Sequence, residues 1–551
     1  MSAINPNSIE FLLQWDIIEN MLPRIGTEQW QPLYLNQDCS PHTFGLWCAL
    51  LDENAAARAL EDDSWDLKIG NGRPGFSQSW AGAETITTYH RFGGHDGVRP
   101  LVVYREFHGA FAPYIELDEE FRLYHNLAKD RGRGLLLDFD SSGREIEVVR
   151  MGDSEILARL KYLRQFQAGL RLSLAIYIDS VRYSKLTLGE VPKDKARWEL
   201  RNDTNRWGLH ISECNFVSGY ATFSRLLGKA LIPPPADSEA GIWPFEKDDD
   251  REVEFIIGTD ENGNPVEYTS NPDELANYFG ANREAPHYLT PLCFRREVLA
   301  KYYAEPERYT ISDGLLRCLG LWSCRIDNDL REHVGVFLGD LGRDLPYEER
   351  LHWRQFNVPP ESGVSETNFR RSFLAQFADA QASDLVFRRE YRRIADDWKQ
   401  EFGWPLFLPL SEGDAYIVDT IRIPATNSQA EMDEQVLYLA KLMVDSLNEK
   451  EISARAGELA KGAQGITKLS GFFDETAFPG ASGVIQFLRD LQELRSRGSG
   501  HRKGSEYEDL IARLGIDASR KREAVANVLG DAASALLAMR SFYIPDEGAA
   551  G

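Results

Sequence analysis

The sequence predicts an α+β protein, in which two regions that contain antiparallel sheets are followed by an all-α helical bundle. Three patterns lead to this prediction. Short apolar runs separated by turn residues fill the stretch 101–149, and a second hairpin pattern lies at 252–269, as is typical of antiparallel strands. From about residue 427, apolar residues recur only at the spacing of amphipathic helices.

The length of 551 residues exceeds that of one ordinary hydrophobic core, so several domains are expected. The predicted segments are an N-terminal α+β domain at 1–230, a linker or long loop at 231–250, a middle α+β domain at 251–425 and a helical domain at 426–551. The linker is indicated by three prolines at 233–235 and a charged run at 247–250, because such compositions rarely build a packed core.

The N-terminal domain is expected to hold an antiparallel sheet. The predicted strands are 101–104, 114–117, 135–139, 145–149 and 172–178. The turn sequence at 140–143 joins two of them as a hairpin, and a helix is predicted near 154–168. Residues 11–15 form a short apolar piece that is helical or strand-like.

The middle domain is predicted to alternate strands with helices. Its predicted strands are 252–257, 266–269, 315–324 and 333–338. Thr290-Pro291 predicts the start of a helix that continues to Tyr303, because proline is favoured at the first helical position. A long helix is predicted at 383–402, with Ser383 as its N-cap.

The helical domain is predicted from three apolar stripes, each of which would face a common core. The stripes are Met432, Val436, Leu439, Met443 and Leu447, then Val484, Phe487, Leu488, Leu491 and Leu494, then Val525, Val528, Leu529, Ala532, Leu536 and Met539. The glycine-rich stretch 462–483 is expected to be a long loop between helices, and loops of that length often carry function or partner contacts.

Composition and charge limit the functional classes. With 43% hydrophobic residues the chain is that of a packed globular protein. The net charge of −24 disfavours DNA binding over a broad surface, because phosphates repel an acidic protein unless a basic patch is segregated. Residues 1–10 lack a signal-peptide pattern, and no apolar run approaches the length of a membrane span. We therefore expect a cytoplasmic protein without a membrane partner.

No metal or cofactor is predicted. The six cysteines contain no CxxC pair, so we expect reduced and mostly buried thiols. The histidines and the acidic run at 116–120 lack the compact spacing of metal ligands. The histidines considered are His90, His95, His108 and His125. The glycine-rich loops at 70–75 and 93–97 lack the flanking elements of a phosphate-binding loop.

A secondary candidate site lies at the end of the predicted strand 333–338. Asp340, Asp344 and His352 follow it closely, and such residues could hold a divalent ion or act as an acid/base pair. The same aspartates are also common in turns and at helix caps ahead of a proline such as Pro346.

The strongest chemical signal lies at 483–504, where an amphipathic helix meets a glycine-containing break. Arg495 stands in the last turn of this helix, and His501 follows after five further residues, with Arg502 and Lys503 beside it. An imidazole and several cations around one helix end indicate a phosphate site.

An Arg and a His at this spacing, at the end of a helix in an all-helical region, resemble the catalytic motif of the HEPN superfamily of bacterial ribonucleases. The resemblance covers about the last quarter of the chain and maps onto Arg495 and His501. It departs from the family pattern at Ser496, where many members carry Asn or another large polar residue. In that family the pair lies in a cleft between two protomers and cleaves RNA without a metal.

The resemblance implies an endoribonuclease effector, of the kind found in bacterial toxin and anti-phage abortive-infection systems. Arg495 and His501 would be the catalytic residues of a homodimer, and the N-terminal part would sense a trigger or a partner protein. We assign Arg497, Arg502 and Lys503 to contacts with RNA.

The alternative hypothesis is a non-catalytic interaction or scaffold protein of a defence complex, whose helical bundle dimerises or docks a partner. On that interpretation Arg495, Arg497 and His501 complement the helix dipole, and the glycines terminate the helix.

Overall fold

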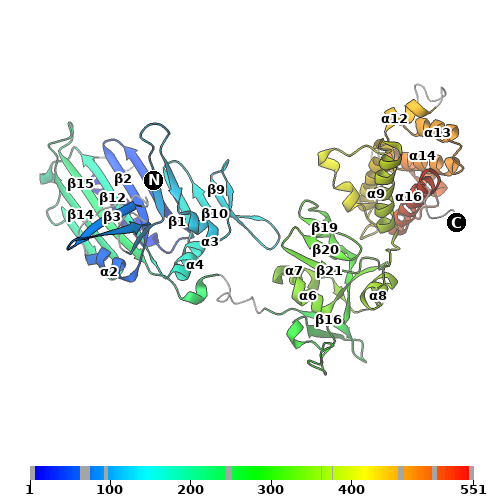
Figure 1. Ribbon diagram of the computed structural model, residues 1–551, viewed down its shortest axis with the longest axis horizontal. Helices are drawn as coiled ribbons and strands as arrows, with labels where there is room; N and C mark the ends of the chain where they lie inside the picture. The colour runs from blue at the N-terminus through cyan, green and yellow to red at the C-terminus, as the bar shows by residue number, and fades with distance from the viewer. Residues whose placement is uncertain are drawn as a thin grey trace. The chain divides into compact units, whose positions relative to one another are not determined.

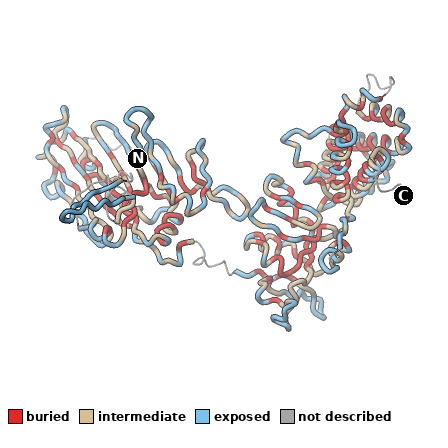
Figure 2. The backbone as a smooth tube through the Cα atoms, in the orientation of Figure 1, coloured by how far each residue is buried: buried red, intermediate tan, exposed pale blue. Residues whose placement is uncertain are grey.

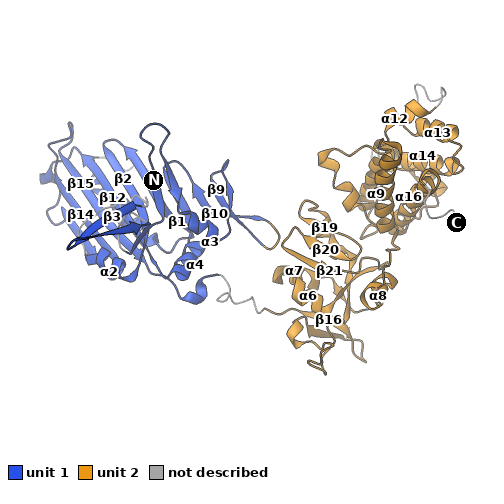
Figure 3. Ribbon diagram, in the orientation of Figure 1, with its two compact units in different colours: residues 1–140, 144–248 blue, residues 141–143, 249–551 orange. Residues whose placement is uncertain are grey.

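The computed structural model describes residues 7–61, 75–91, 97–241, 251–360, 363–374, 376–456, 465–498 and 505–544. The chain divides into two compact units (Figure 3). The first comprises residues 1–140 and 144–248, and the second comprises 141–143 and 249–551. Within the described ranges, no helix combines the length and the apolar character needed to cross a bilayer.

The first unit is built on one large antiparallel sheet (Figure 1). In its described part the strand order is β13-β14-β15-β12-β2-β1-β11-β10-β9-β8, and β5 also pairs with β2. The strands are β1 (Trp30–Cys39), β2 (His42–Leu51), β5 (Val98–Pro100), β8 (Ala128–Asp130), β9 (Leu135–Phe139), β10 (Glu145–Met151), β11 (Glu155–Arg159), β12 (Ser173–Ser184), β13 (Arg197–Arg201), β14 (Asn205–Glu213) and β15 (Thr222–Ile232). The predicted hairpin at 135–149 is confirmed as β9 and β10.

Helices cover both faces of this sheet. They are α1 (Ile9–Leu13), α2 (Glu53–Glu61), α3 (Glu119–Tyr124) and α4 (Leu160–Leu170). Side chains alternate along a strand, so Leu174, Ile176 and Ile178 of β12 enter the larger core together with residues of α1, α3 and α4. Ala175 and Tyr177 enter the smaller core on the other face, together with alanines of α2.

Two hairpins lie outside the large sheet. One pairs β6 (Val102–Arg105) with β7 (Tyr114–Leu117), which confirms the two strands predicted there. The other pairs β3 (Gly75–Ala81) with β4 (Glu84–His90) and is exposed along almost its whole length (Figure 2).

The helix predicted near 154–168 begins later than expected. Residues 155–159 form β11, and the helix α4 covers only Leu160–Leu170. Ile156 and Ala158 are both buried, and this alternation with a period of two places β11 between β1 and β10. The apolar period of a strand therefore outweighs the helical signal in these five residues.

The second unit contains two separate hydrophobic cores, of which the first belongs to the middle region. Its strands form the groups β16-β17, β22-β18-β23 and β19-β20-β21. They are β16 (Glu254–Thr259), β17 (Pro265–Thr269), β18 (Pro291–Arg295), β19 (Tyr309–Ile311), β20 (Leu315–Cys318), β21 (Trp322–Arg325), β22 (His333–Phe337) and β23 (Asn357–Val358). The helices are α5 (Ala300–Tyr303), α6 (Leu338–Asp344), α7 (Tyr347–Arg354) and α8 (Glu366–Ser372).

Two predictions for this region are corrected. The helix expected from Thr290-Pro291 to Tyr303 begins instead as the strand β18, with Pro291 as its first residue. Only residues 296–303 of it are helical, as a 3-10 segment followed by α5. Leu292, Cys293 and Phe294 are all buried between β22 and β23, and a proline is tolerated at the first position of a strand as well as of a helix. The single strand expected at 315–324 is the hairpin of β20 and β21.

The second core of this unit is helical (Figure 1). Its helices are α9 (Ser383–Phe402), α10 (Ile417–Thr420), α11 (Gln429–Ala440), α12 (Glu449–Arg455), α13 (Gly465–Glu475), α14 (Ala481–Gly498), α15 (Ser505–Arg513) and α16 (Lys521–Tyr543), with a π-helical segment, η8 (Lys441–Asp445), after α11. Residues of all three predicted stripes are buried in this core, which confirms the helical class of the C-terminal region.

The helical core also contains segments that were predicted otherwise. Phe387, Ile394 and Trp398 of α9 are buried in it, so the core begins well before the expected boundary at 425. The loop predicted at 462–483 contains α13, whose Leu469 and Phe473 are buried in the same core. Both segments are amphipathic, and their apolar faces can only be buried against the other helices.

Candidate functional site

The predicted helix with the Arg and His motif is α14. Val484, Leu488, Leu491 and Leu494 are buried on one face of it, which leaves the last turn free to present basic side chains. Arg495 and Arg497 stand in that turn, as predicted. The described chain stops at Gly498 and resumes at Ser505, so the predicted residues His501, Arg502 and Lys503 lie outside the described residues.

Arg495 reaches back to the π-helical segment η8. Its Nη1 donates to Oδ2 of Asp445 at 2.5 Å, and the two side chains are 26% and 47% exposed. An ion pair at this level of exposure contributes only about 0–1 kcal/mol. A phosphate group could therefore replace Asp445 as the partner of Arg495 at little cost.

Arg497 connects the two ends of the segment 499–504. It lies 2.9 Å from the carboxylate of Glu493 within α14. Its Nη1 also donates to the backbone carbonyl of Glu506 at 3.0 Å, in the first turn of α15. Both flanks of the segment that contains His501 are thus held together by one guanidinium.

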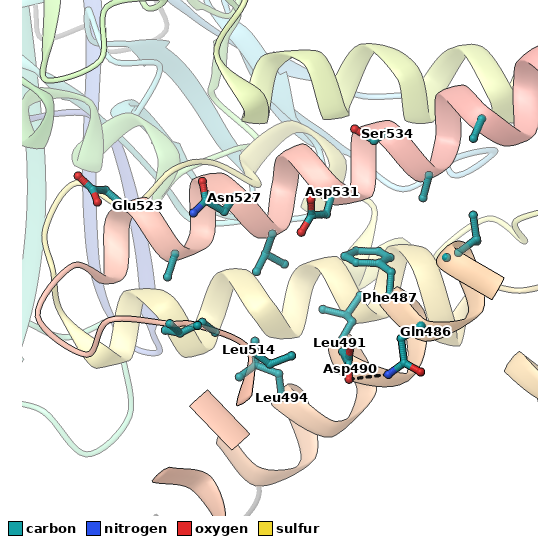
Figure 4. Close-up of a pocket in the computed structure, with 18 of the residues that line it drawn as sticks. Gln486, Phe487, Asp490, Leu491, Leu494, Leu514, Glu523, Asn527, Asp531 and Ser534 are labelled. Carbon is teal, nitrogen blue, oxygen red and sulfur yellow. Dashed lines mark hydrogen bonds between the residues drawn. The ribbon is translucent and has the colours of Figure 1, made fainter. Parts of the chain in front are cut away.

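A groove of about 610 Å³ runs between α14 and α16 (Figure 4). Its apolar part includes Phe487, Leu491 and Leu494 from α14, with alanines and Val528 from α16. Arg495 and Arg497 do not line this groove. This groove was not predicted, because its lining comes from helices that are not adjacent in the sequence.

Acidic residues dominate the polar part of the groove. Asp490, Asp517, Glu523 and Asp531 line it, against the single cation Arg520. Asp490 is paired with Arg513 from outside the lining, and partial burial raises the pKa of Asp531. Glu523 is also paired with Arg331 and Arg520, and Asp517 lies 3.9 Å from Arg520. The remaining excess of acidic groups in the groove is small, and it favours a cationic ligand over phosphate.

The secondary candidate site is only partly assembled. Arg343 joins Asp340 and Asp344, with nitrogen to oxygen distances of 2.9 and 2.6 Å. His352 faces another part of the core, where its Nε2 lies 2.9 Å from the carbonyl oxygen of Val298, and burial lowers its pKa. An acid/base pair of Asp340 with His352 is therefore excluded by their separate environments.

The described residues contain no cluster of three or more His, Cys, Asp or Glu side chains that could hold a metal ion. His125 is packed among aromatic rings and lies against the carbonyl of Tyr162. Asp118 and Glu120 of the acidic run are paired with Arg99. His95 lies outside the described residues, and five of the six cysteines are buried.

No family model, curated protein or solved structure matches the chain in the comparisons made with known proteins.

Proposed function

We propose that the helical region is a metal-independent endoribonuclease, and that the protein is an effector of the toxin or abortive-infection type. The observation that carries this proposal is the concentration of basic groups at the end of α14. Arg495 and Arg497 occupy its last turn, and five basic side chains fall within residues 495–503 of a chain whose net charge is −24. The N-terminal unit would then recognise a trigger or a partner protein.

The proposed reaction uses the ribose as its own nucleophile. His501 accepts the proton of the 2′-hydroxyl while the 2′ oxygen bonds to phosphorus, and the bond from phosphorus to the 5′ oxygen breaks. The departing 5′ oxygen takes up a proton, so the products are a cyclic phosphate and a 5′-hydroxyl. Arg495 stabilises the charge that develops on the phosphoryl oxygens, and Arg497, Arg502 and Lys503 bind the neighbouring phosphates.

A homodimer is part of this proposal. One Arg and one His per chain form a sparse site, and a two-fold axis beside α14 would bring two such pairs together. The acidic groove between α14 and α16 would repel its own copy, so the dimer would use a different face of α14. Sedimentation at micromolar concentration measures this association directly.

The test is RNA cleavage by the purified full-length protein with and without a chelator. Removing one charge-stabilising or proton-transferring group costs on the order of 100-fold in rate or more. Arg495→Ala and His501→Ala should therefore each abolish cleavage, and the chelator should have no effect. Arg489→Ala is the matched control, because Arg489 is exposed on the same helix away from its last turn. Cleavage that persists without His501, or that requires added Mg²⁺, contradicts the proposal.

A second candidate function is supported by the groove between α14 and α16. Its apolar floor and acidic lining suit a cationic amphipathic helix of a partner protein, which would lay its apolar face on Leu491 and Val528. A model peptide of this kind, labelled for fluorescence anisotropy, should bind the wild-type protein. Glu523→Gln together with Asp531→Asn should weaken that binding without changing RNA cleavage.

A further inference from the structure

A separate cavity of about 610 Å³ lies in the middle region, between α6, α8 and the strands β21 and β22. Its volume falls within the range of small-molecule sites. All of its lining residues lie between Tyr288 and Ser372, so it is independent of the Arg495 site. Apolar side chains, including Leu289, Val336 and Phe337, form part of its wall.

Most of the carboxylates around this cavity already accept hydrogen bonds from other residues of the protein. Asp327 accepts hydrogen bonds from the backbone nitrogen and the hydroxyl of Ser365, both at 2.7 Å. Asp329 accepts from the Thr367 hydroxyl at 2.6 Å and from backbone nitrogens of the segment before α9. Asp313 is paired with Arg371 at 2.7 Å. These hydrogen bonds fix the positions of Asp327 and Asp329 without removing their charges, whereas Arg371 compensates the charge of Asp313.

Asp340 differs from these carboxylates. Its side chain is 6% exposed, and its Oδ1 accepts hydrogen bonds at 2.9 Å from both the Tyr288 hydroxyl and Arg343. Among the described residues no donor reaches its Oδ2. Burial raises the pKa of Asp340, and the nearby charges of Arg343 and Arg325 oppose this rise. One oxygen of a buried carboxyl group on the cavity wall is thus available to a donor from a ligand.

The position of Tyr288 depends on a glycine. A Cβ atom at Gly339 would lie 2.2 Å from the ring of Tyr288, so a larger residue would displace that ring and its hydrogen bond to Asp340. Gly339 therefore leaves room for the Tyr288 ring, and Tyr288 in turn donates its hydrogen bond to Oδ1 of Asp340.

The cavity wall also carries two side chains that can donate hydrogen bonds to a ligand. Arg325, at the end of β21, is exposed, and its guanidinium group forms no hydrogen bond or ion pair with any residue in the described part of the chain. Asn368 of α8 accepts from the Ser372 hydroxyl at 2.6 Å, and its amide NH₂ has no acceptor among the described residues. Both residues line the cavity with Asp340.

We propose that this cavity binds a small organic anion with hydroxyl groups. An oxyanion of the ligand, either phosphate or carboxylate, takes hydrogen bonds from Arg325 and Asn368, and a ligand hydroxyl donates to Oδ2 of Asp340. A guanidinium pairs with either oxyanion through two parallel hydrogen bonds. Sugar phosphates and sugar acids share this chemistry.

Calorimetric titration of the full-length protein tests the proposal with four probes. Ribose 5-phosphate and gluconate each carry an oxyanion and hydroxyl groups, whereas inorganic phosphate and ribose each carry only one of the two features. At least one of the first two should bind more tightly than both of the last two, and the tighter of them identifies the preferred oxyanion. Absence of binding by ribose 5-phosphate and gluconate at millimolar concentration overturns the proposal.

Variants then locate the site. Arg325→Gln should weaken binding of the preferred probe by about tenfold or more, because a charge-assisted hydrogen bond is lost. Arg317→Gln is the matched control, since Arg317 is an exposed arginine on the neighbouring strand β20 and does not line the cavity. Asp340→Asn should weaken the binding of ribose 5-phosphate more than the binding of inorganic phosphate. Equal binding by the Arg325→Gln variant and the wild type contradicts the assignment. Since RNA cleavage is not the readout, failure here leaves the ribonuclease proposal unaffected.

Discussion

The guanidinium of Arg495 in the last turn of α14 donates a hydrogen bond to the carboxylate of Asp445 at the end of η8, at 2.5 Å. The residue predicted to bind the scissile phosphate is therefore held by an acidic neighbour in the isolated chain. In the proposed reaction RNA would compete with Asp445 for this guanidinium, so Asp445 would limit that reaction.

Asp445→Asn should raise the rate of RNA cleavage at subsaturating RNA. An exposed ion pair contributes about 1 kcal/mol at most, and without it this free energy no longer opposes the binding of RNA to Arg495. The cleavage rate should therefore rise by up to about fivefold. The initial rate of cleavage measures this gain. Asp490→Asn is the control, because Asp490 lies on α14 but pairs with Arg513. An equal gain in both variants would indicate a general effect of net charge and would contradict a specific role for Asp445.

The secondary structure was predictable where local and tertiary signals agree. The hairpin of β9 and β10 combines a turn sequence with alternating apolar residues, and both strands were found at their predicted positions. Pro291 misled the prediction because the same residue opens either a helix or a strand, and only the pairing of β18 with β22 and β23 decides between them. α13 was missed because the glycines around it outweighed the helical spacing of Leu469 and Phe473.

The sites were less predictable than the elements. The position of Arg495 at the helix end follows from local sequence, but its ion pair with Asp445 joins residues 50 positions apart. The cavity around Asp340 depends on Tyr288, which lies 52 positions away. Contacts at such separations depend on how the elements pack, and no periodicity in one segment encodes them.

His125 should make the stability of the first unit sensitive to acid. Its ring lies among Phe121, Tyr124 and Tyr162, and burial lowers its pKa to about 4 from 6.5. Between these values the unfolded chain binds more protons than the folded one, so the free energy of unfolding falls as the pH decreases from about 6.5 to 4. The contribution of this residue is up to about 3 kcal/mol.

Chemical denaturation at several pH values measures this effect, with a probe specific to the first unit. His125→Gln should flatten the dependence on pH in that window, because glutamine has no proton to gain. His210→Gln, at an exposed position of β14, should leave the dependence unchanged. An unchanged slope in the His125→Gln variant would assign the acid sensitivity to other groups.

Lys301 should be important for the stability of the middle region. Its ammonium lies 2.7 Å from both oxygens of Glu349, a side chain that is 3% exposed and also accepts from the Tyr302 hydroxyl at 2.6 Å. Lys301→Met leaves a buried carboxylate without its cation, which costs about 3 kcal/mol. Adding Glu349→Gln should recover part of this loss.

Urea unfolding followed by tryptophan fluorescence measures these changes, since the buried Trp353 donates to the Tyr302 hydroxyl at 2.8 Å. Arg354→Met is the matched control, because it removes a more exposed ion pair with Glu267. The control should cost less than about 1 kcal/mol. If the Lys301→Met and Arg354→Met variants have the same stability, the buried carboxylate does not depend on Lys301.

The helical domain should begin near residue 380 and not at residue 427. A fragment of residues 380–544 should fold, whereas a fragment of residues 427–544 should not. The shorter fragment lacks α9, whose Phe387, Ile394 and Trp398 are buried in the helical core. Losing the contacts of a single large core side chain costs about 2–5 kcal/mol, so losing several exceeds the total stability of a typical domain, about 5–15 kcal/mol.

A fragment that begins at residue 380 loses fewer apolar contacts than one that begins at residue 427. It lacks the Ile311 carbonyl and the Tyr303 hydroxyl as acceptors for Arg388 but keeps the Ile421 carbonyl, and water can solvate the guanidinium nitrogens that lose their acceptors. Thermal unfolding followed by circular dichroism should show one cooperative transition for residues 380–544 and none for residues 427–544. Protease digestion of the full chain should likewise release a resistant fragment that retains α9. A cooperative transition of the shorter fragment at the same temperature would place the domain boundary at 425 after all, and α9 would then be an addition to a core that is stable without it.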